Sequence, residues 1–131
     1  MRLGGYDYSS DGYYFVTLCA SDKARFRNSK QAVEVTLLSL PASIKGLAID
    51  YHVVMDDHVH VILIIEGSGR SVGDIVRQFK AFVSMAVGGK GIWQKGYYEH
   101  VIRNDKALMK IREYIRDNPL VKEIEFDQFY L

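Results

Sequence analysis

The chain has 131 residues, of which 48% are hydrophobic and 25% are charged, and its formal net charge is +1. This length suffices for one domain that buries about two-thirds of its unfolded surface, and a single cysteine, Cys19, excludes an internal disulfide framework. No apolar run approaches the roughly 18 residues that cross a membrane, and residues 1–5 lack the apolar core of a signal peptide. We therefore expect a single cytoplasmic domain over residues 1–131, without a membrane partner.

The near-neutral total conceals an uneven distribution of charge. Residues 70–122 contain eleven Lys or Arg against five Asp or Glu, whereas residues 1–69 contain six against eight and residues 123–131 contain none against three. A basic second half is suited to attract a polyanion such as nucleic acid. A solvated, charged helix face is the alternative explanation of the same pattern.

The first part of the chain predicts a strand and then a helix. Residues 12–20 alternate and are rich in Tyr, Phe, Val and Thr, which is typical of a strand. Cys19 lies in this apolar context, so we expect a buried thiol rather than a reactive one. Residues 31–40 place apolar side chains at helical spacing, and Pro41 is expected to end that helix.

A hairpin and a second helix follow. Residues 47–55 and 58–65 predict two strands, joined by a tight turn through the polar pair at residues 56–57. Ser71 is a plausible N-cap for a helix that ends at Gly88. The side chains expected to face the core of that helix are Val72, Ile75, Val76, Phe79 and Phe82.

The last predicted elements are a fourth strand and a third helix. Residues 97–103 are expected to form the strand, and Asn104 or Asp105 caps a helix that runs to about residue 117, before Pro119. The order β-α-β-β-α-β-α predicts an α+β, ferredoxin-like fold. It has a four-stranded, mostly antiparallel sheet with helices on one face and one extra helix.

Two histidines, His58 and His60, stand two residues apart on the third predicted strand, and their side chains therefore project to the same face. Two neutral imidazoles held side by side can bind one divalent metal, with a third ligand from elsewhere in the fold. The alternative is a pair of strand histidines whose rings are simply hydrogen-bonded.

The last predicted helix carries a second candidate group. Tyr114 and Asn118 are four residues apart and lie on one face, and Tyr114 stands at the edge of the packing stripe formed by Leu108, Ile111 and Ile115. A boundary aromatic with its hydroxyl in water is the alternative interpretation of Tyr114. For Asn118 the alternative is a helix terminator before Pro119.

Five sequence blocks occur in a fixed order: YFVT at 14–17, VMDDHVHVIL at 54–63, FKAF at 79–82, IWQKGYYEHVIR at 92–103, and YI followed by NP at 114–119. From about residue 6 to residue 122 the chain resembles the HUH single-strand DNA transposases of the insertion-sequence 200/605 group. It is most similar to their REP-associated tyrosine transposase relatives. The conjunction of the blocks is more specific than any one of them.

This resemblance implies a metal-dependent DNA strand transferase. His58, His60 and Asn118 would bind Mg or Mn, and Tyr114 would attack a phosphodiester of single-stranded or hairpin DNA to give a 5′-phosphotyrosine. Family members differ in whether the tyrosine acts on its own chain or on that of a dimer partner, so a homodimer is a possibility. Relatives usually carry Pro-Asn before the first histidine, whereas this chain has Asp56-Asp57. Those carboxylates would either fix the histidine tautomers or repel the phosphate.

A basic rim with aromatic side chains is expected to hold the DNA. Trp93 is either a stacking platform or a core anchor, and His100 is expected to be structural or to contact phosphate rather than to bind metal. The cations expected to contact nucleic acid are Arg77, Lys80, Lys95, Arg103, Arg112 and Arg116. Two further hypotheses remain: a catalytically inactive regulator that binds structured DNA, and an interaction domain that binds no nucleic acid.

Overall fold

The computed structural model describes residues 11–131, and the expectation about a signal peptide concerns residues outside that range. A four-stranded antiparallel sheet forms the centre of the molecule, with the strand order β2-β3-β1-β4. The strands are β1 (Gly12–Cys19), β2 (Leu47–Val54), β3 (His58–Ile65) and β4 (Tyr98–Ile102). This order and the element sequence confirm the predicted ferredoxin-like α+β fold.

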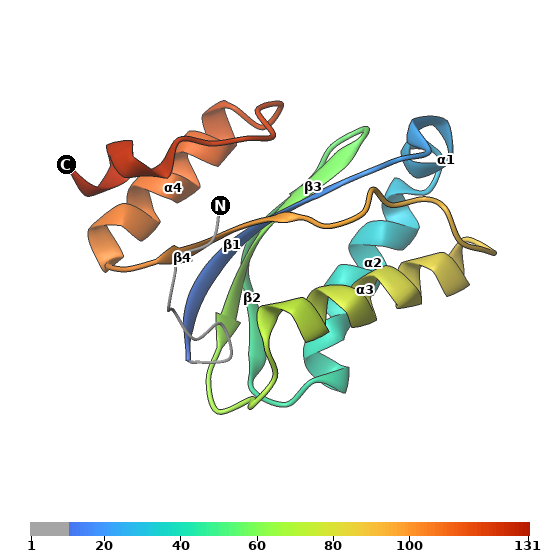
Figure 1. Ribbon diagram of the computed structural model, residues 1–131, viewed down its shortest axis with the longest axis horizontal. Helices are drawn as coiled ribbons and strands as arrows, with labels where there is room; N and C mark the ends of the chain where they lie inside the picture. The colour runs from blue at the N-terminus through green and yellow to red at the C-terminus, as the bar shows by residue number, and fades with distance from the viewer. Residues whose placement is uncertain (1–10) are drawn as a thin grey trace.

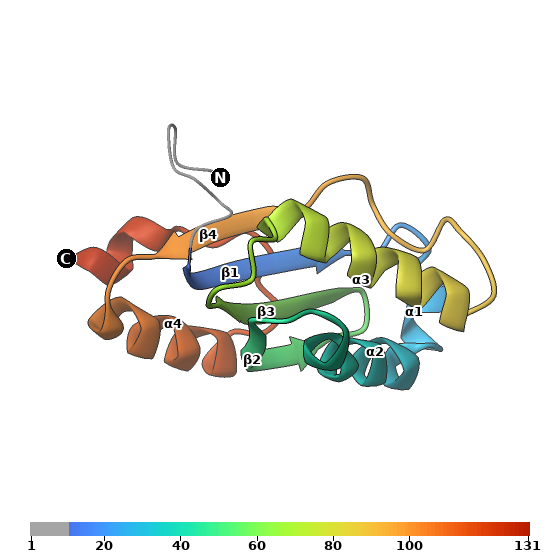
Figure 2. The same cartoon turned by 90° about the horizontal axis from the view of Figure 1, so that it is seen from below.

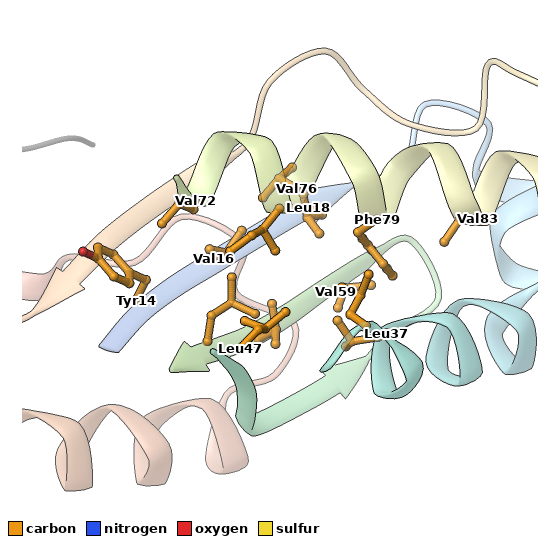
Figure 3. Close-up of a cluster of buried hydrophobic side chains, with 14 of the residues drawn as sticks. Tyr14, Val16, Leu18, Leu37, Leu47, Val59, Val72, Val76, Phe79 and Val83 are labelled. Atoms are coloured by element: carbon orange, nitrogen blue, oxygen red, sulfur yellow. The ribbon is translucent and has the colours of Figure 1, made fainter. Parts of the chain in front are cut away.

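Two long helices cover one face of the sheet, as Figures 1 and 2 show. They are α2 (Lys30–Ser43) and α3 (Val72–Ala86), and the short helix α1 (Lys23–Arg27) precedes them. Between these helices and the sheet lies the main core, which includes Val59, Val16 and Phe79 (Figure 3). Alternate residues of β3 supply this core, because successive side chains of a strand point to opposite faces.

The opposite face of the sheet is covered by α4 (Asp105–Asp117) and by the C-terminal 3₁₀ helix η1 (Phe126–Tyr130), drawn in orange and red in Figure 1. A second apolar cluster fills this side and contains Phe15 and Ile62 from the sheet, Ile111 and Ile115 from α4, and Phe129 from η1. The extra helix of the predicted fold therefore lies across the sheet from the other two.

Helix ends follow the local rules that the sequence indicates. The Ser71 hydroxyl accepts a hydrogen bond from the Asp74 backbone N–H at 3.1 Å, and the Asn104 side chain accepts one from Ala107 N–H at 2.8 Å. Gly88 follows α3 with a left-handed φ of 84°, a conformation that glycine adopts without strain. Both predicted N-caps are therefore confirmed.

Three details differ from the sequence-based expectation. Pro41 does not end α2 but lies within its last turn, because a proline there removes only one intrahelical hydrogen bond and Ile44 N–H still reaches Leu40 O at 3.0 Å. Helices α1 and η1 were not predicted, since five-residue elements carry too short a pattern to stand out. Ala20, expected in the first strand, instead forms an isolated bridge with Trp93.

Within residues 11–131, none of the helices combines the length and the hydropathy that crossing a bilayer requires.

Candidate active site

His58 and His60 lie side by side on β3 and point towards the α4 face of the sheet. Both are fully buried, with no exposed surface, and their ring centroids are 4.7 Å apart. Strand alternation places them opposite Val59 and Val61, as predicted. Their backbone partners on β1 are Cys19 and Thr17. A rigid central strand thus fixes the spacing of the two imidazoles.

One nitrogen of each ring is held by a side-chain partner. His58 Nδ1 lies 2.8 Å from Asp57 Oδ1, and His60 Nδ1 lies 2.8 Å from Thr17 Oγ1. Such partners fix the orientation of an imidazole ring, whereas the tautomer does not follow from them here, because the Thr17 hydroxyl can donate or accept and His58 has an acceptor oxygen at each ring nitrogen. On both histidines, therefore, Nε2 is on the side of the ring away from these partners, where the chain that follows α4 passes. The sequence-based hypothesis included Asp57 in this role but did not identify Thr17.

The two Nε2 atoms are in different situations. His60 Nε2 is buried and forms no hydrogen bond of good geometry among residues 11–131, although backbone groups of Val121 and Pro119 lie close enough to raise the pKa of the ring. His58 Nε2 lies 2.8 Å from the Pro119 carbonyl oxygen. Burial, followed by the neighbouring His58, lowers the pKa of His60 to about 4. His60 is therefore neutral at pH 7, which is the form that binds a metal.

The chain that follows α4 covers the histidine pair. Pro119 supplies the carbonyl at His58, and Lys122 Nζ donates to Asp57 Oδ2 at 2.7 Å, which fastens this segment to the residue that holds His58 Nδ1. Asn118 is exposed, and its side-chain Nδ2 donates to the Tyr114 carbonyl at 3.1 Å. The third predicted ligand is thus the C-cap of α4 in this conformation, one residue from the contact with His58.

The residues present fit a divalent cation in part. An unpaired, buried and neutral imidazole nitrogen is the donor that borderline metals prefer, and a second imidazole lies beside it. Within residues 11–131 no group of three or more His, Cys, Asp or Glu side chains is arranged to hold a metal. A third ligand would therefore have to be neutral, as the amide of Asn118 is, or come from a bound substrate.

Tyr114 lies on the same side of the sheet as the histidines. Its half-buried ring meets Phe129 edge-on at 5.4 Å, and it flanks the buried stripe of α4 as predicted. Its carbonyl accepts from Asn118 N–H at 2.8 Å, and the next residue, Pro119, contacts His58. The C-terminal turn of α4 therefore brings the tyrosine helix to the histidine pair of the same chain.

An ion pair joins α4 to the sheet. Arg112 Nε and Nη2 donate to the two carboxylate oxygens of Asp50, at 2.9 and 2.5 Å. Asp50 stands at a bulge between Ile49 and Tyr51, where one extra residue of β2 redirects a side chain towards α4. Arg112, predicted to contact DNA, is thus used within the protein, and Asp50 is a site residue that sequence patterns did not reveal.

The acidic pair before the first histidine is neutralised by lysines. Asp56 pairs with Lys30 at 2.9 Å, and Asp57 is 2.7 Å from Lys122 and 3.9 Å from Lys23. The hydrogen bond from Lys122, and then that from His58, lowers the pKa of Asp57 to about 2. Both carboxylates are thus paired with cations, which reduces the repulsion that they would exert on a phosphate.

The residues predicted to bind nucleic acid fall into two groups. Arg77, Lys80, Lys95 and Trp93 line one cleft of about 880 Å³ between α3 and residues 88–97. The other three, Arg103, Arg112 and Arg116, lie at the end of β4 and on α4. The single rim inferred from sequence is therefore divided between two parts of the surface.

Several of these side chains also have partners within the protein. Lys80 Nζ donates to the carbonyls of Gln94 and Gly96, at 3.0 and 2.8 Å, and the Arg103 guanidinium lies 4.1 Å above the Tyr130 ring. Trp93 packs edge-on against Phe26 and is half-buried, so it acts as a core anchor that still borders the cleft. Arg116 is exposed and pairs with the adjacent Asp117.

His100 has a structural environment. Its ring stacks on Phe126 at 4.0 Å, and its Nε2 is 2.7 Å from the Tyr130 hydroxyl, so it docks η1 against β4. Burial, and then Arg103, lowers the pKa of His100 to about 4. The expectation that His100 is structural agrees with these contacts.

The stability of the fold is expected to decrease on mild acidification. The unfolded chain takes up a proton at His100 near pH 6.5, whereas the folded chain does so only near pH 4, so the free energy of unfolding falls as the pH drops through that interval. Between pH 7 and pH 5 we expect His100 to account for about 2 kcal/mol of this loss. Urea denaturation at both pH values should show that His100→Phe removes this share. The control His52→Phe, at a half-exposed position beside Glu34, should retain it, and an equal loss in His100→Phe would contradict the assignment.

Known proteins resemble this chain over much of its length, although no model of a protein family matches it. It is 30% identical to an uncharacterised protein of Haemophilus influenzae over 167 aligned positions, which cover all of this chain and 92% of that relative. It is 34% identical to a REP-associated tyrosine transposase of Escherichia coli K12 over 68 residues, which are 52% of this chain and 41% of the transposase. A solved structure of a REP-associated tyrosine transposase bound to a REP hairpin matches with a TM-score of 0.75 and 26% identity, covering 92% of this chain and 73% of that one.

Proposed function

We propose that the chain, which is similar in sequence and fold to REP-associated tyrosine transposases, cleaves and rejoins single-stranded, hairpin-flanked DNA in a metal-dependent reaction. Tyr114 is the nucleophile of the proposal. His58, His60 and Asn118 would hold Mg or Mn.

The observation that carries the proposal is the convergence of α4 and the histidine pair on one face of one sheet. Thr17 and Asp57 leave both Nε2 atoms directed to this face. The last turn of α4 runs from Tyr114 to Asn118, and the carbonyl oxygen of the next residue, Pro119, contacts His58. The buried His60 Nε2 forms no hydrogen bond of good geometry among the described residues, so a ligand at this nitrogen would satisfy a polar atom that the fold leaves poorly satisfied.

In the proposed reaction the Tyr114 hydroxyl oxygen forms a bond to phosphorus as the bond from phosphorus to the 3′ oxygen breaks. The phenolic proton is lost, the departing 3′ oxygen takes up a proton, and the 5′ phosphate stays on the tyrosine. A divalent cation, when bound, would polarise a non-bridging phosphate oxygen and offset the charge that develops. Attack by a free 3′-OH reverses the step, so rejoining needs no other energy source.

The proposal assigns the tyrosine and the histidines of one chain to one active site. The apolar stripe of α4 packs on the sheet of its own chain, and the Arg112–Asp50 ion pair adds a bidentate attachment. The proposal therefore does not call on the homodimer considered from sequence.

A second candidate function is a regulator that binds structured DNA without cleaving it. The contact between the Pro119 carbonyl and His58 Nε2 favours it, because in this arrangement one of the two metal-facing nitrogens is already bonded. A labelled hairpin with a single-stranded flank, incubated with Mn²⁺, distinguishes the two. A covalent protein–DNA adduct on a denaturing gel supports the transferase, and salt-dependent binding without an adduct supports the regulator.

Metal binding is expected to compete with the segment that carries Pro119. Because Lys122 fastens this segment to Asp57, Lys122→Ala should populate the open arrangement and raise the apparent Mn²⁺ affinity by roughly two- to tenfold. Isothermal titration measures the change. Lys122→Arg retains the ion pair and should match the unsubstituted protein. An unchanged or weaker Mn²⁺ affinity in Lys122→Ala would show that the segment does not compete.

A further inference from the structure

The cleft beside α3, here called the α3 cleft, has an apolar floor and a cationic edge. The half-buried rings of Trp93 and Tyr97 and the side chain of Val76 contribute to its lining. Gly73 keeps the cleft open beneath Tyr97, since a Cβ at this position would lie 3.2 Å from the Tyr97 hydroxyl. With a volume of about 880 Å³ the cleft has the size of a site for a small organic ligand.

Residues 88–97 form the outer wall of the α3 cleft, and hydrogen bonds from two cations hold this segment near both of its ends. Arg25 of α1 donates to the carbonyl of Gly89 and, at 2.7 Å, to that of Lys90. Lys80 of α3 donates to the carbonyls of Gln94 and Gly96. In Figure 1 the segment of residues 88–97, drawn in yellow and orange, runs from the end of α3 past α1 and back along α3 to β4. Two cations thus preform the wall, and occupation of the cleft requires little ordering of the chain.

The charge of the lining selects an anion. Four cations, Arg77, Lys80, Lys90 and Lys95, border the α3 cleft, and within the part of the chain that the structure describes none of its lining residues is acidic. Arg77 pairs at 2.7 Å with Asp74, which lies outside the lining, and Lys80 donates to backbone carbonyls. Lys90 and Lys95 are therefore the cations of the cleft whose side chains have neither an acidic nor a backbone partner among residues 11–131. An apolar floor with aromatic rings and a cationic edge matches a ligand that is planar and apolar in one part and anionic in another. A nucleobase with its adjoining phosphates has this composition.

A second cavity borders the same segment as the α3 cleft. A smaller cavity of about 280 Å³ shares the lining residues 94–97 with the cleft and adds Cys19 and Tyr98. Tyr98 is 39% exposed and pairs in register with Thr17, whose other neighbour across the sheet is His60. Residues paired in this way share a face, so Tyr98 stands two strand spacings, about 10 Å, from His60 on the α4 face.

We propose that the α3 cleft binds an unstacked base of single-stranded DNA and that residues 94–98 guide the strand from there around the edge of β4 to the histidine pair. Arg77, Lys90 and Lys95 meet the flanking phosphates, and the base lies against Trp93 and Tyr97. This assignment rests on the proposed function for the class of ligand, but binding in the cleft does not depend on the chemistry at Tyr114.

The single tryptophan of the chain provides a direct test, because Trp93 borders the α3 cleft. The uncleaving variant Tyr114→Phe is titrated with a thymidine oligonucleotide of about ten nucleotides and with an abasic oligonucleotide of the same length. We expect the thymidine strand to quench Trp93 emission and to bind at least about fivefold more tightly, since stacking of one base on an aromatic ring gives a gain of that order. Equal affinities, or no quenching, would overturn the proposal.

A substitution that fills the cleft is the second arm of the test. Ala81 is exposed on α3 and lines the cleft, so Ala81→Leu should reduce the affinity for the thymidine strand about fivefold and leave that for the abasic strand unchanged. Ala42→Leu, at an exposed position of α2 outside the cleft, is the matched control and should have no effect. If both variants bind the thymidine strand alike, the cleft is not the site of the base.

Failure of this inference and failure of the proposed function give different results. Base-dependent quenching without any covalent adduct from the unsubstituted protein would retain the α3 cleft as a base site and reject strand transfer. Adduct formation without base-dependent quenching would retain strand transfer and reject the cleft.

Discussion

Tyr114→Phe is expected to abolish the covalent protein–DNA adduct and to lower the rate of strand cleavage by at least about 10³-fold. The substitution removes only the oxygen that would bond to phosphorus, while the ring keeps its edge-on contact with Phe129. Loss of the nucleophile in another covalent enzyme costs about 10⁶-fold in rate. The measurement is the adduct formed with an end-labelled hairpin substrate in Mn²⁺, resolved on a denaturing gel.

Tyr51→Phe is the matched control for this variant. Tyr51 is also half-buried and packs against the same apolar cluster on the α4 face, but it stands on β2 rather than on the helix that ends at the histidines. It should cleave at the rate of the unsubstituted protein. If Tyr114→Phe retains adduct formation, Tyr114 is not the nucleophile and the strand-transfer mechanism as written is wrong.

His60→Leu is expected to lower the affinity for Mn²⁺ by at least about 100-fold and to reduce cleavage to background. It removes the unpaired Nε2 and replaces the imidazole by an apolar side chain that packs beside Phe15. Thr17→Val should have a smaller effect of roughly 10- to 100-fold, because it removes only the partner of Nδ1. Isothermal titration with Mn²⁺ and the cleavage assay give the two readouts.

The matched control for the metal site is His52→Leu. This histidine lies on β2, where it pairs with Glu34 at 3.1 Å and has no contact with the His58–His60 pair. It should leave both Mn²⁺ affinity and cleavage unchanged. Equal Mn²⁺ affinities in His60→Leu and the unsubstituted protein would place the metal elsewhere, and a graded loss through Thr17→Val would support the role of Thr17 in orienting the His60 ring.

Short-range sequence patterns predicted the strand faces and the helix caps, which depend on residues close together in the chain. Strand alternation separated His58 and His60 from Val59 and Val61, and the caps at Ser71 and Asn104 marked where helices begin. In each case the determining contacts lie within a few residues along the chain, so they can be read from spacing alone. The placement of Tyr114 at the edge of the packing stripe has the same origin.

Contacts between distant segments could not be predicted in this way. The Pro119 carbonyl that meets His58 belongs to the backbone, which has no signature in the sequence, and Thr17 reaches His60 only because β1 and β3 pair in one particular register. Asp50 depends on a bulge that shifts its side chain towards Arg112. These residues complete the candidate site, and each is supplied by tertiary structure rather than by a motif.

Several Lys and Arg side chains of residues 70–122 pair within the protein, and this pairing affects how DNA binding would depend on salt concentration. A cation that neutralises a DNA phosphate releases condensed counterions, and each such contact adds to the slope of log affinity against log salt concentration. Lys80 donates to loop carbonyls, Arg112 to Asp50 and Lys122 to Asp57. In this arrangement these three charges hold the fold together and release few ions. The ionic-strength dependence of binding would then be shallower than the basic composition of residues 70–122 suggests, and a larger share of the affinity would come from contacts to unstacked bases.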